Sequence, residues 1–268
     1  MGFRTRLLWA LMSVVLLLTF IYVFVRVFVC DRFVVEGVSM VPTCSTGQVV
    51  FVNKLLMGAR IYKEYDFSSS HLSCVRMPGL RKIHVGDVVA FNFNYDWSTN
   101  TIGFKINNVY LKRCVGCPGD TVRINDGHYV CPAAKCIPND AQSALASTPD
   151  SLLVLQGIPI NAFEFAPYLK WTIKEFGPLY IPQAGDVVRI DKNNVALYES
   201  LIEYETGYKP EVKGNVVFHS GKALEKYEFK TNYYFLAGDN VLYSTDSRYF
   251  GLVPEDYIIG IIPSLYGG

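Results

Sequence analysis

A serine and a lysine in this sequence have surroundings that could form a hydrolytic pair. Ser39 lies in Gly-Val-Ser-Met-Val-Pro-Thr, residues 37–43, and Lys112 lies in Tyr-Leu-Lys-Arg-Cys-Val-Gly-Cys-Pro-Gly-Asp, residues 110–120. A free lysine titrates at about 10.4, but burial disfavours the ammonium and can lower its pKa by several units. A neutral lysine could take the proton of an attacking serine and then protonate the leaving amine.

Each residue also has an ordinary explanation. A serine before a proline is commonly a turn residue, and a strand lysine commonly extends its amine to water. No histidine lies near Ser39 in the sequence, and Val41 stands where a G-x-S-x-G elbow would have its second glycine. Each residue taken alone is therefore weak evidence of catalysis.

Strand alternation separates the two adjacent cations at 112 and 113. If residues 109–115 form a strand, Tyr110, Lys112 and Cys114 face one side, and Leu111 and Arg113 face the other. The two cations can therefore have different roles.

A third polar cluster lies in residues 238–254, which begin Gly-Asp-Asn and contain Ser244, Asp246 and Arg248. It follows an apolar run at 233–236. The cluster is either a solvated surface loop or a packed, hydrogen-bonded support, and its density of donors and acceptors favours the second.

An uncharged run of apolar residues, Leu7 to Val25, precedes these segments. As a helix it would span roughly 28 Å, close to the hydrocarbon thickness of a bilayer. Arg4 and Arg6 before it predict a cytoplasmic N-terminus, with everything after residue 30 outside. A cleavable signal peptide is the alternative, but the bulky residues at 26–30 offer no small-x-small cleavage site. We predict a retained, single-pass anchor over residues 1–30.

The rest of the chain, residues 31–268, is predicted to be a mainly β, antiparallel catalytic domain. Short β-branched and aromatic runs are separated by glycine-rich turns. Residues 125–230 lack the dense motifs of the flanking regions and are predicted to form an inserted or capping β-rich subdomain. The best helix candidates are residues 140–156 and 161–176. The apolar runs lie at 49–52, 88–93, 109–111, 187–190 and 233–236.

Composition and cysteine content limit the possible partners. A net charge of +1 with no long basic run argues against nucleic acid. Seven cysteines leave at least one unpaired within a monomer. Cys131 and Cys136 could close a small disulfide. Cys114 and Cys117 form a C-x-x-C that is either redox-active or, as we favour, two small buried residues beside a turn. We expect no metal and no cofactor.

Taken together, the motifs resemble the bacterial signal peptidase I (leader peptidase) family of Ser/Lys proteases. Ser-Met-x-Pro-Thr, Tyr-x-Lys-Arg-x-Val-Gly-x-Pro-Gly-Asp and Gly-Asp-Asn…Ser-x-Asp-Ser-Arg occur in the family's order, with a further match at Gly86–Phe91 and a leading membrane span. The resemblance covers residues 1–125 and 231–263. It implies a serine endopeptidase that removes signal peptides from exported preproteins, with Ser39 as nucleophile and Lys112 as general base. It places the domain on the outer, periplasmic or extracytoplasmic face of the plasma membrane.

The resemblance also implies supporting and substrate-binding roles. Ser244 would hydrogen-bond Lys112, and Arg113–Asp239 and Asp246–Arg248 would form supporting ion pairs. Gly37 stands where some family members have a serine hydroxyl for the oxyanion. The pocket for the −1 residue of the signal peptide would be lined by Met40, Cys44, Tyr110 and Leu111, and the pocket for the −3 residue by Phe33, Val35, Val50 and Leu111.

Two other functions fit part of the pattern. A self-cleaving Ser/Lys regulator that binds DNA would need a helix-turn-helix and a basic face, and neither is visible in the sequence. A non-catalytic, membrane-tethered β protein that binds exported chains would be expected to lack Ser39 or Lys112, and both are present.

Overall fold

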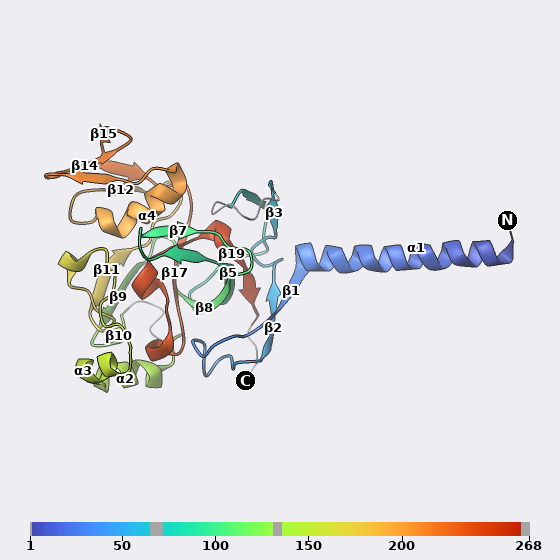
Figure 1. The fold of residues 1–268 in the computed structure, drawn as a ribbon, viewed down its shortest axis with the longest axis horizontal. Coiled ribbons are helices and arrows are strands. Elements are labelled where there is room, and N and C mark those ends of the chain that lie inside the picture. The colour runs from blue at the N-terminus through green and yellow to red at the C-terminus, as the bar shows by residue number, and fades with distance from the viewer. Residues whose placement is uncertain (1, 65–71, 131–135, 264–268) are drawn as a thin grey trace.

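The computed structural model describes residues 2–64, 72–130 and 136–263, and it begins with one long, isolated helix. Helix α1 (Phe3–Phe24) continues into a π-helical turn, η1 (Val25–Val29), and none of its residues is buried. Within this segment, Phe3–Val29, an 18-residue stretch has a mean hydropathy of 2.5, and the segment is long and apolar enough to cross a membrane. Figure 1 shows α1 projecting from the domain, with the N-terminus at its far end. The predicted anchor segment therefore forms a helix whose apolar side chains are not buried by the described residues.

No linker separates the helix from the domain. Strand β1 (Cys30–Val34) begins immediately after η1 and pairs with β2 (Val49–Asn53) from its first residue, Cys30 opposite Asn53. The backbone N–H of Lys54 also donates to the carbonyl of Val29 at 2.9 Å. The end of the helix is therefore tied directly into the sheet.

The domain is built on a curled, antiparallel seven-stranded sheet, which confirms the predicted mainly β class. Its strands are β1, β2, β19 (Ile258–Ile262), β5 (Val88–Asn92), β8 (Val109–Gly116), β17 (Tyr233–Ala237) and β18 (Val253–Pro254), in that spatial order. Strands β5, β17 and β19 are buried along their whole length. Near-continuous apolar sequence is what a strand covered on both faces requires.

The two faces of the sheet pack on two cores. Because side chains alternate along β5, those of Val89 and Phe91 point into the larger core and those of Val88 and Ala90 point into the smaller one. The smaller core lies beneath the turn that carries Ser39 and contains Val35, Met40, Cys44, Val50, Val52, Val88, Ala90, Ile259 and Ile262.

The remaining strands form small sheets around this one. They pair as β3 (Arg60–Tyr62) with β4 (Cys74–Arg76), β6 (Asn94–Asp96) with β7 (Thr101–Gly103), β9 (Thr121–Asn125) with β10 (His128–Tyr129) and β11 (Phe176–Tyr180), β12 (Val187–Arg189) with β16 (Lys226–Glu228), and β14 (Val216–His219) with β13 (Glu211–Lys213) and β15 (Lys222–Ala223).

The helices of segment 125–230 lie partly at other positions than its sequence indicated. The first predicted helix, 140–156, is present as α2 (Asn139–Ser147) and α3 (Asp150–Leu155). The second, 161–176, is wrong. That segment contains only the 3-10 turn η3 (Pro167–Leu169), and the backbone of Phe163 and Lys170 has positive φ, which interrupts any helix. The sequence also missed α4 (Val195–Thr206), which ends at Gly207 with φ of 76°.

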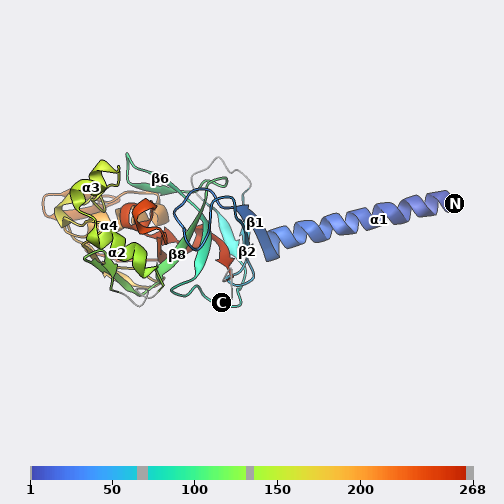
Figure 2. The same cartoon turned by 90° about the horizontal axis from the view of Figure 1, so that it is seen from below.

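Segment 125–230 packs on the same large core as the sheet, since Leu145, Phe176 and Leu201 belong to one cluster with Phe235. Figures 1 and 2 place α2 and α3 at the end of the domain away from α1. Its separation as a subdomain stays a prediction.

Two cysteine predictions lie in or beside this segment. The proposed Cys131–Cys136 bond falls outside the described residues, which leave out 131–135. Cys114 is fully buried and Cys117 partly buried, with their sulfurs 3.7 Å apart.

Candidate active site

The structure brings Ser39 and Lys112 into contact. The Lys112 Nζ donates a hydrogen bond to the Ser39 Oγ at 2.6 Å, although the two residues lie 73 positions apart in the sequence. Lys112 lies on β8, where it pairs with Val89 of β5 in the middle of the sheet. Ser39 lies in the turn between β1 and β2, next to Met40, which is anchored in the smaller core.

The environment of the Lys112 amine favours its neutral form. The side chain is 3% exposed. Burial lowers the pKa of Lys112 to about 8, although the nearby Asp246 carboxylate partly opposes this shift. At pH 8 about half of Lys112 is thus neutral and able to accept a proton, whereas an exposed lysine is almost fully protonated there.

One ion pair joins the turn that carries Ser39, residues 37–43 (the serine turn), to the strand that carries Lys112. Arg113 binds Asp239 through Nε at 2.6 Å and a terminal nitrogen at 2.5 Å. The same guanidinium donates to the carbonyl of Gly86 at 2.7 Å and to the Thr43 hydroxyl at 3.1 Å, and Thr43 in turn donates to Asp239. Because Thr43 closes the serine turn, this bidentate pair connects the turn, β8 and the end of β17.

A second ion pair, Asp246–Arg248, is completely buried behind Lys112. The Asp246 carboxylate accepts from Arg248 Nε at 2.8 Å and from an Arg248 terminal nitrogen at 2.9 Å. It also accepts from the backbone N–H of Gly238 at 3.0 Å and from the Ser244 hydroxyl at 2.7 Å. Burial would raise the pKa of Asp246, but the charge and hydrogen bonds of Arg248 outweigh burial and hold the pKa below its usual value.

Ser244 therefore has a different partner from the one that the resemblance implied. Its hydroxyl donates to Asp246, and the described residues show no hydrogen bond between Ser244 and Lys112. A carboxylate is a stronger acceptor than a neutral hydroxyl or amine, so it takes the Ser244 proton in this arrangement.

Two further residues that the sequence analysis did not single out hold the serine turn. Asn240 donates its backbone N–H to the carbonyl of Ser39 at 3.0 Å and its side-chain amide to the carbonyl of Val38 at 3.1 Å. Thr43 is the other, through its bonds to Arg113 and Asp239. Both residues lie inside the motifs quoted above, and this position in the motifs is the feature of the sequence that could have identified them.

Gly238 lies where the serine turn and the Ser244 segment meet. A Cβ at this position would lie 2.2 Å from the Ser244 Oγ and 2.5 Å from the Ser39 carbonyl oxygen. Only glycine lets the two segments approach this closely.

We expect Gly238→Ala to lower kcat/KM for peptide cleavage by about 100-fold, since a displacement of roughly 1 Å at a catalytic group costs that much. Initial rates over a range of substrate concentrations test this. Gly221→Ala is the control, because Gly221 has φ of 78° and no atom near its Cβ position, so it loses stability without losing activity. Wild-type kcat/KM in Gly238→Ala would show that the close approach is unimportant.

A groove of about 410 Å³ opens at the catalytic pair, between the end of β1 and the beginning of β8. Five of the seven predicted substrate-binding residues line it: Phe33, Val35, Met40, Tyr110 and Leu111. The other two, Cys44 and Val50, do not line it, because both are buried in the smaller core behind it. They support its wall.

Both strands beside the groove have an open backbone edge. In the described residues, β1 pairs only with β2. Residues 109–112 of β8 pair only with β5, because β17 joins β8 from Arg113 onward. The groove therefore offers unpaired N–H and C=O groups to an extended peptide.

Comparisons with known proteins identify the family of this chain. The family model described as "Signal peptidase, peptidase S26" matches residues 7–156 and 181–266. Signal peptidase I of Buchnera aphidicola subsp. Acyrthosiphon pisum is 26% identical over 247 residues, 88% of this chain and 68% of the relative. Signal peptidase I of Pseudomonas fluorescens is 23% identical over 258 residues, 90% and 66% of the two chains. With its Ser39–Lys112 contact beside an open groove and with most of its length matched, the chain belongs to the signal peptidase family, peptidase S26, whose members are serine peptidases.

Proposed function

We propose that this protein is a membrane-bound signal peptidase I. It hydrolyses the peptide bond after the N-terminal signal peptide of exported preproteins, with Ser39 as nucleophile and neutral Lys112 as general base. The observation that carries the proposal is the 2.6 Å contact between a buried lysine amine and a serine hydroxyl, in a chain of this family.

The proposed chemistry needs only the groups at this contact. Neutral Lys112 takes the Ser39 proton as Oγ attacks the carbonyl carbon of the scissile bond. The resulting ammonium then gives that proton to the departing amine, which leaves an acyl-enzyme ester on Ser39. Lys112, neutral again, takes a proton from a water molecule whose oxygen attacks the ester carbonyl carbon. When the bond from that carbon to Ser39 Oγ breaks, the Lys112 ammonium returns the proton to Oγ and the signal peptide leaves with a free carboxylate.

The oxyanion of each tetrahedral intermediate needs hydrogen-bond donors. The backbone N–H of Ser39 has no acceptor among the described residues and is one such donor. Gly37 has no side chain to add a second donor at the position where some family members have a serine. The second donor is thus a backbone group or water.

The substrate would bind as an extended strand in the groove. Its backbone would pair with the open edges of β1 and β8, and its −1 and −3 side chains would point toward the wall that Cys44 and Val50 support from behind. A groove closed by a packed core admits small side chains and rejects large ones.

The membrane arrangement follows from α1 and its flanking charges. Arg4 and Arg6 would hold the N-terminus in the cytoplasm, and the domain 31–268 would lie on the outer face of the bacterial plasma membrane. The groove begins at Arg32, two residues after the start of β1, so it lies at the anchored side of the domain.

The test is cleavage of a purified preprotein with alanine at −1 and −3 by the full-length protein, followed from pH 6 to 10. We expect a single new N-terminus after the −1 residue. We expect kcat/KM to be low below pH 8 and to rise to a plateau above it, because Lys112 must lose its proton and its pKa is about 8.

A matched preprotein with a bulky residue at −1 should resist cleavage. Failure to cleave the alanine substrate would end the proposal. An inflection near 10, where a free lysine titrates, would show that burial does not lower the pKa of the catalytic lysine, which would contradict a base that is neutral near pH 8.

A further inference from the structure

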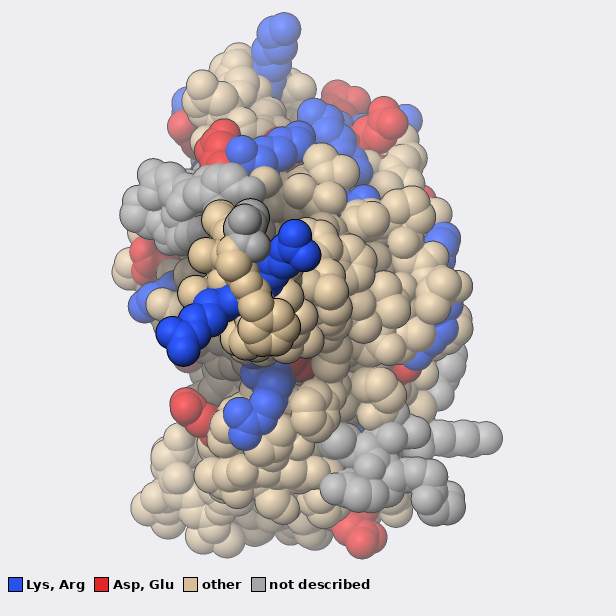
Figure 3. Space-filling view, turned by 90° about the vertical axis from the view of Figure 1, so that its right-hand side faces the viewer, with Lys and Arg blue, Asp and Glu red and all other residues tan. Residues whose placement is uncertain are grey.

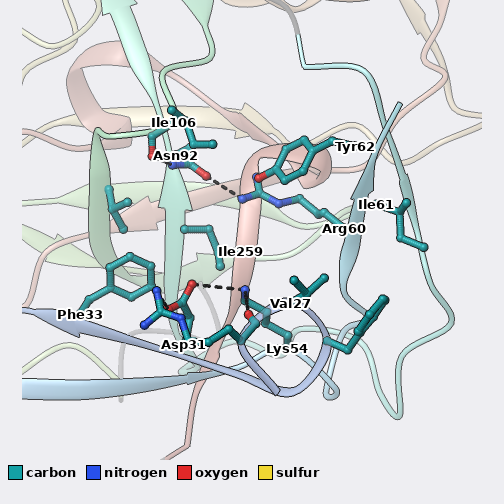
Figure 4. A pocket seen from close by; sticks show the side chains of 13 residues that line it. Val27, Asp31, Phe33, Lys54, Arg60, Ile61, Tyr62, Asn92, Ile106 and Ile259 are labelled. Carbon is teal, nitrogen blue, oxygen red and sulfur yellow. Dashed lines mark hydrogen bonds and ion pairs between the residues drawn. The ribbon is translucent and has the colours of Figure 1, made fainter. Parts of the chain in front are cut away.

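A second cavity lies where the helix joins the domain. Its volume is about 510 Å³, and it is lined by residues of η1, β1, β3 and β19, by the end of β5 and the start of β8, and by Lys54 and Ile106. Figure 4 shows Lys54 with Asp31 on one side, Arg60 with Asn92 on the other, and Ile259 between them. The catalytic pair does not line this cavity, so it requires its own explanation.

The charged groups that line the cavity are mostly positive. Arg26 and Lys54 share one carboxylate, Asp31, at 2.9 Å and 3.3 Å. Lys54 Nζ also donates to the carbonyl of Arg26 at 2.7 Å. An ammonium has three N–H groups, so one remains available to a ligand.

Arg60 adds a charge that no carboxylate of the described residues neutralises. Its side chain is buried, and its terminal nitrogens donate to neutral oxygens: the carbonyls of Asp256 and Tyr257, and the Asn92 amide oxygen at 2.6 Å. None of the described acidic side chains forms an ion pair with it. A buried, unpaired guanidinium is costly, and a bound anion would reduce that cost.

The walls between these charges are apolar. Val27 and Phe28 come from the turn at the end of the apolar helix, and Ile61, Ile106 and Ile259 come from the domain. Figure 3, which views the molecule from the anchor end, shows Lys and Arg side chains on this side of the molecule, interspersed with Asp and Glu. The ligand that suits this cavity thus has an anionic group joined to apolar chains, and it is present where the helix leaves the bilayer.

We propose that this cavity binds the headgroup phosphate of an anionic phospholipid from the leaflet that surrounds the C-terminal end of α1. Lys54 and Arg26 contact the phosphate, Arg60 attracts it from behind Asn92, and the acyl chains follow Val27 and Phe28 along the helix. This inference rests on the membrane insertion in the proposed function, but not on the Ser39–Lys112 chemistry.

The experiment uses the full-length protein in a neutral detergent, titrated with dioleoylphosphatidylglycerol or dioleoylphosphatidylcholine. Native mass spectrometry counts the lipids that each protein molecule retains. We expect one tightly retained phosphatidylglycerol and no comparable phosphatidylcholine.

In Lys54→Gln we expect retention of phosphatidylglycerol to weaken roughly tenfold, as befits the loss of one charged hydrogen bond. Lys54→Arg should restore it, because the charge returns. Lys82→Gln is the matched control, since Lys82 lines a different cavity, with Arg76 and Arg81. Melting temperatures of all variants confirm that they are folded.

Three results would overturn the assignment. Equal retention of the two lipids would show that charge is not recognised. Displacement of the lipid by equimolar glycerol phosphate would indicate a site for free anions. A higher KM for preprotein in Lys54→Gln, with unchanged lipid retention, would indicate that the cavity binds the upstream part of the signal peptide. The cavity shares Phe33, Ile106 and Val109 with the substrate groove. Lipid retention is measured without cleavage, so an inactive protein would still test it.

Discussion

Replacing Lys112 with methionine is expected to lower kcat/KM for preprotein cleavage by about 10⁴-fold or more. Methionine has similar length and suits a buried site, but it cannot accept the Ser39 proton. Ser39→Ala should cause a loss of the same size, and the double variant should lose no more than either single one, because the two groups act as a unit. Initial rates measured on the same preprotein give all three values.

Two further variants make this prediction specific. Lys112→Arg should also be inactive, because a guanidinium stays protonated at the pH of the assay. Lys105→Met should cleave at the wild-type rate, since Lys105 is exposed outside the groove. If Lys112→Met kept a tenth of the wild-type rate, another base would have to be sought.

Removing the Asp246 carboxylate is expected to cause the largest loss of stability. In Asp246→Ala, the fully buried Arg248 guanidinium loses its only ion-pair partner among the described residues, and the Gly238 N–H and Ser244 hydroxyl lose their acceptor. Breaking one side of a buried pair costs about 3–5 kcal/mol. For a domain of this size, that lowers the melting temperature by about 10 °C. Activity should fall as well, because Gly238 and Ser244 lie against the serine turn.

Thermal unfolding followed by circular dichroism measures this effect. Glu211→Ala is the matched control, because it breaks the Glu211–Lys213 pair, in which both side chains are about two-thirds exposed. Exposed pairs contribute little, so its melting temperature should stay at the wild-type value. Equal melting temperatures for the two variants would mean that the Asp246–Arg248 pair does not support the site.

The sequence predicted local features of the site better than long-range ones. Alternation along one strand separated Lys112 from Arg113, and in the structure they bind different partners, Ser39 and Asp239. Alternation cannot say how deep a side chain lies. Cys44 and Val50 were expected to line the groove, yet they pack behind it, because depth depends on strands that pair from distant parts of the chain.

The sequence also could not predict which group accepts the hydrogen bond of the Ser244 hydroxyl. Its neighbour in space, Asp246, is close in sequence, but the carboxylate's position depends on Arg248 and on the end of β17. The missed helix α4 has a different reason. Its residues Val195–Tyr198 are all buried, so more than one side of the helix is covered and the apolar positions do not follow a clear 3.6-residue period.

Under the proposed function, the direct passage from η1 into β1 also limits which bonds the enzyme can reach. For a chain anchored by α1, the hydrogen bonds that begin at Cys30 and Val29 fix the height of the groove above the bilayer. The domain then holds the groove at one set distance from the membrane. Consider a substrate whose own apolar segment lies in the bilayer beside α1. Its scissile bond reaches Ser39 only if the residues between that segment and the bond span the distance from the bilayer to the groove. Distance from the bilayer is then a second criterion for cleavage, besides side-chain size.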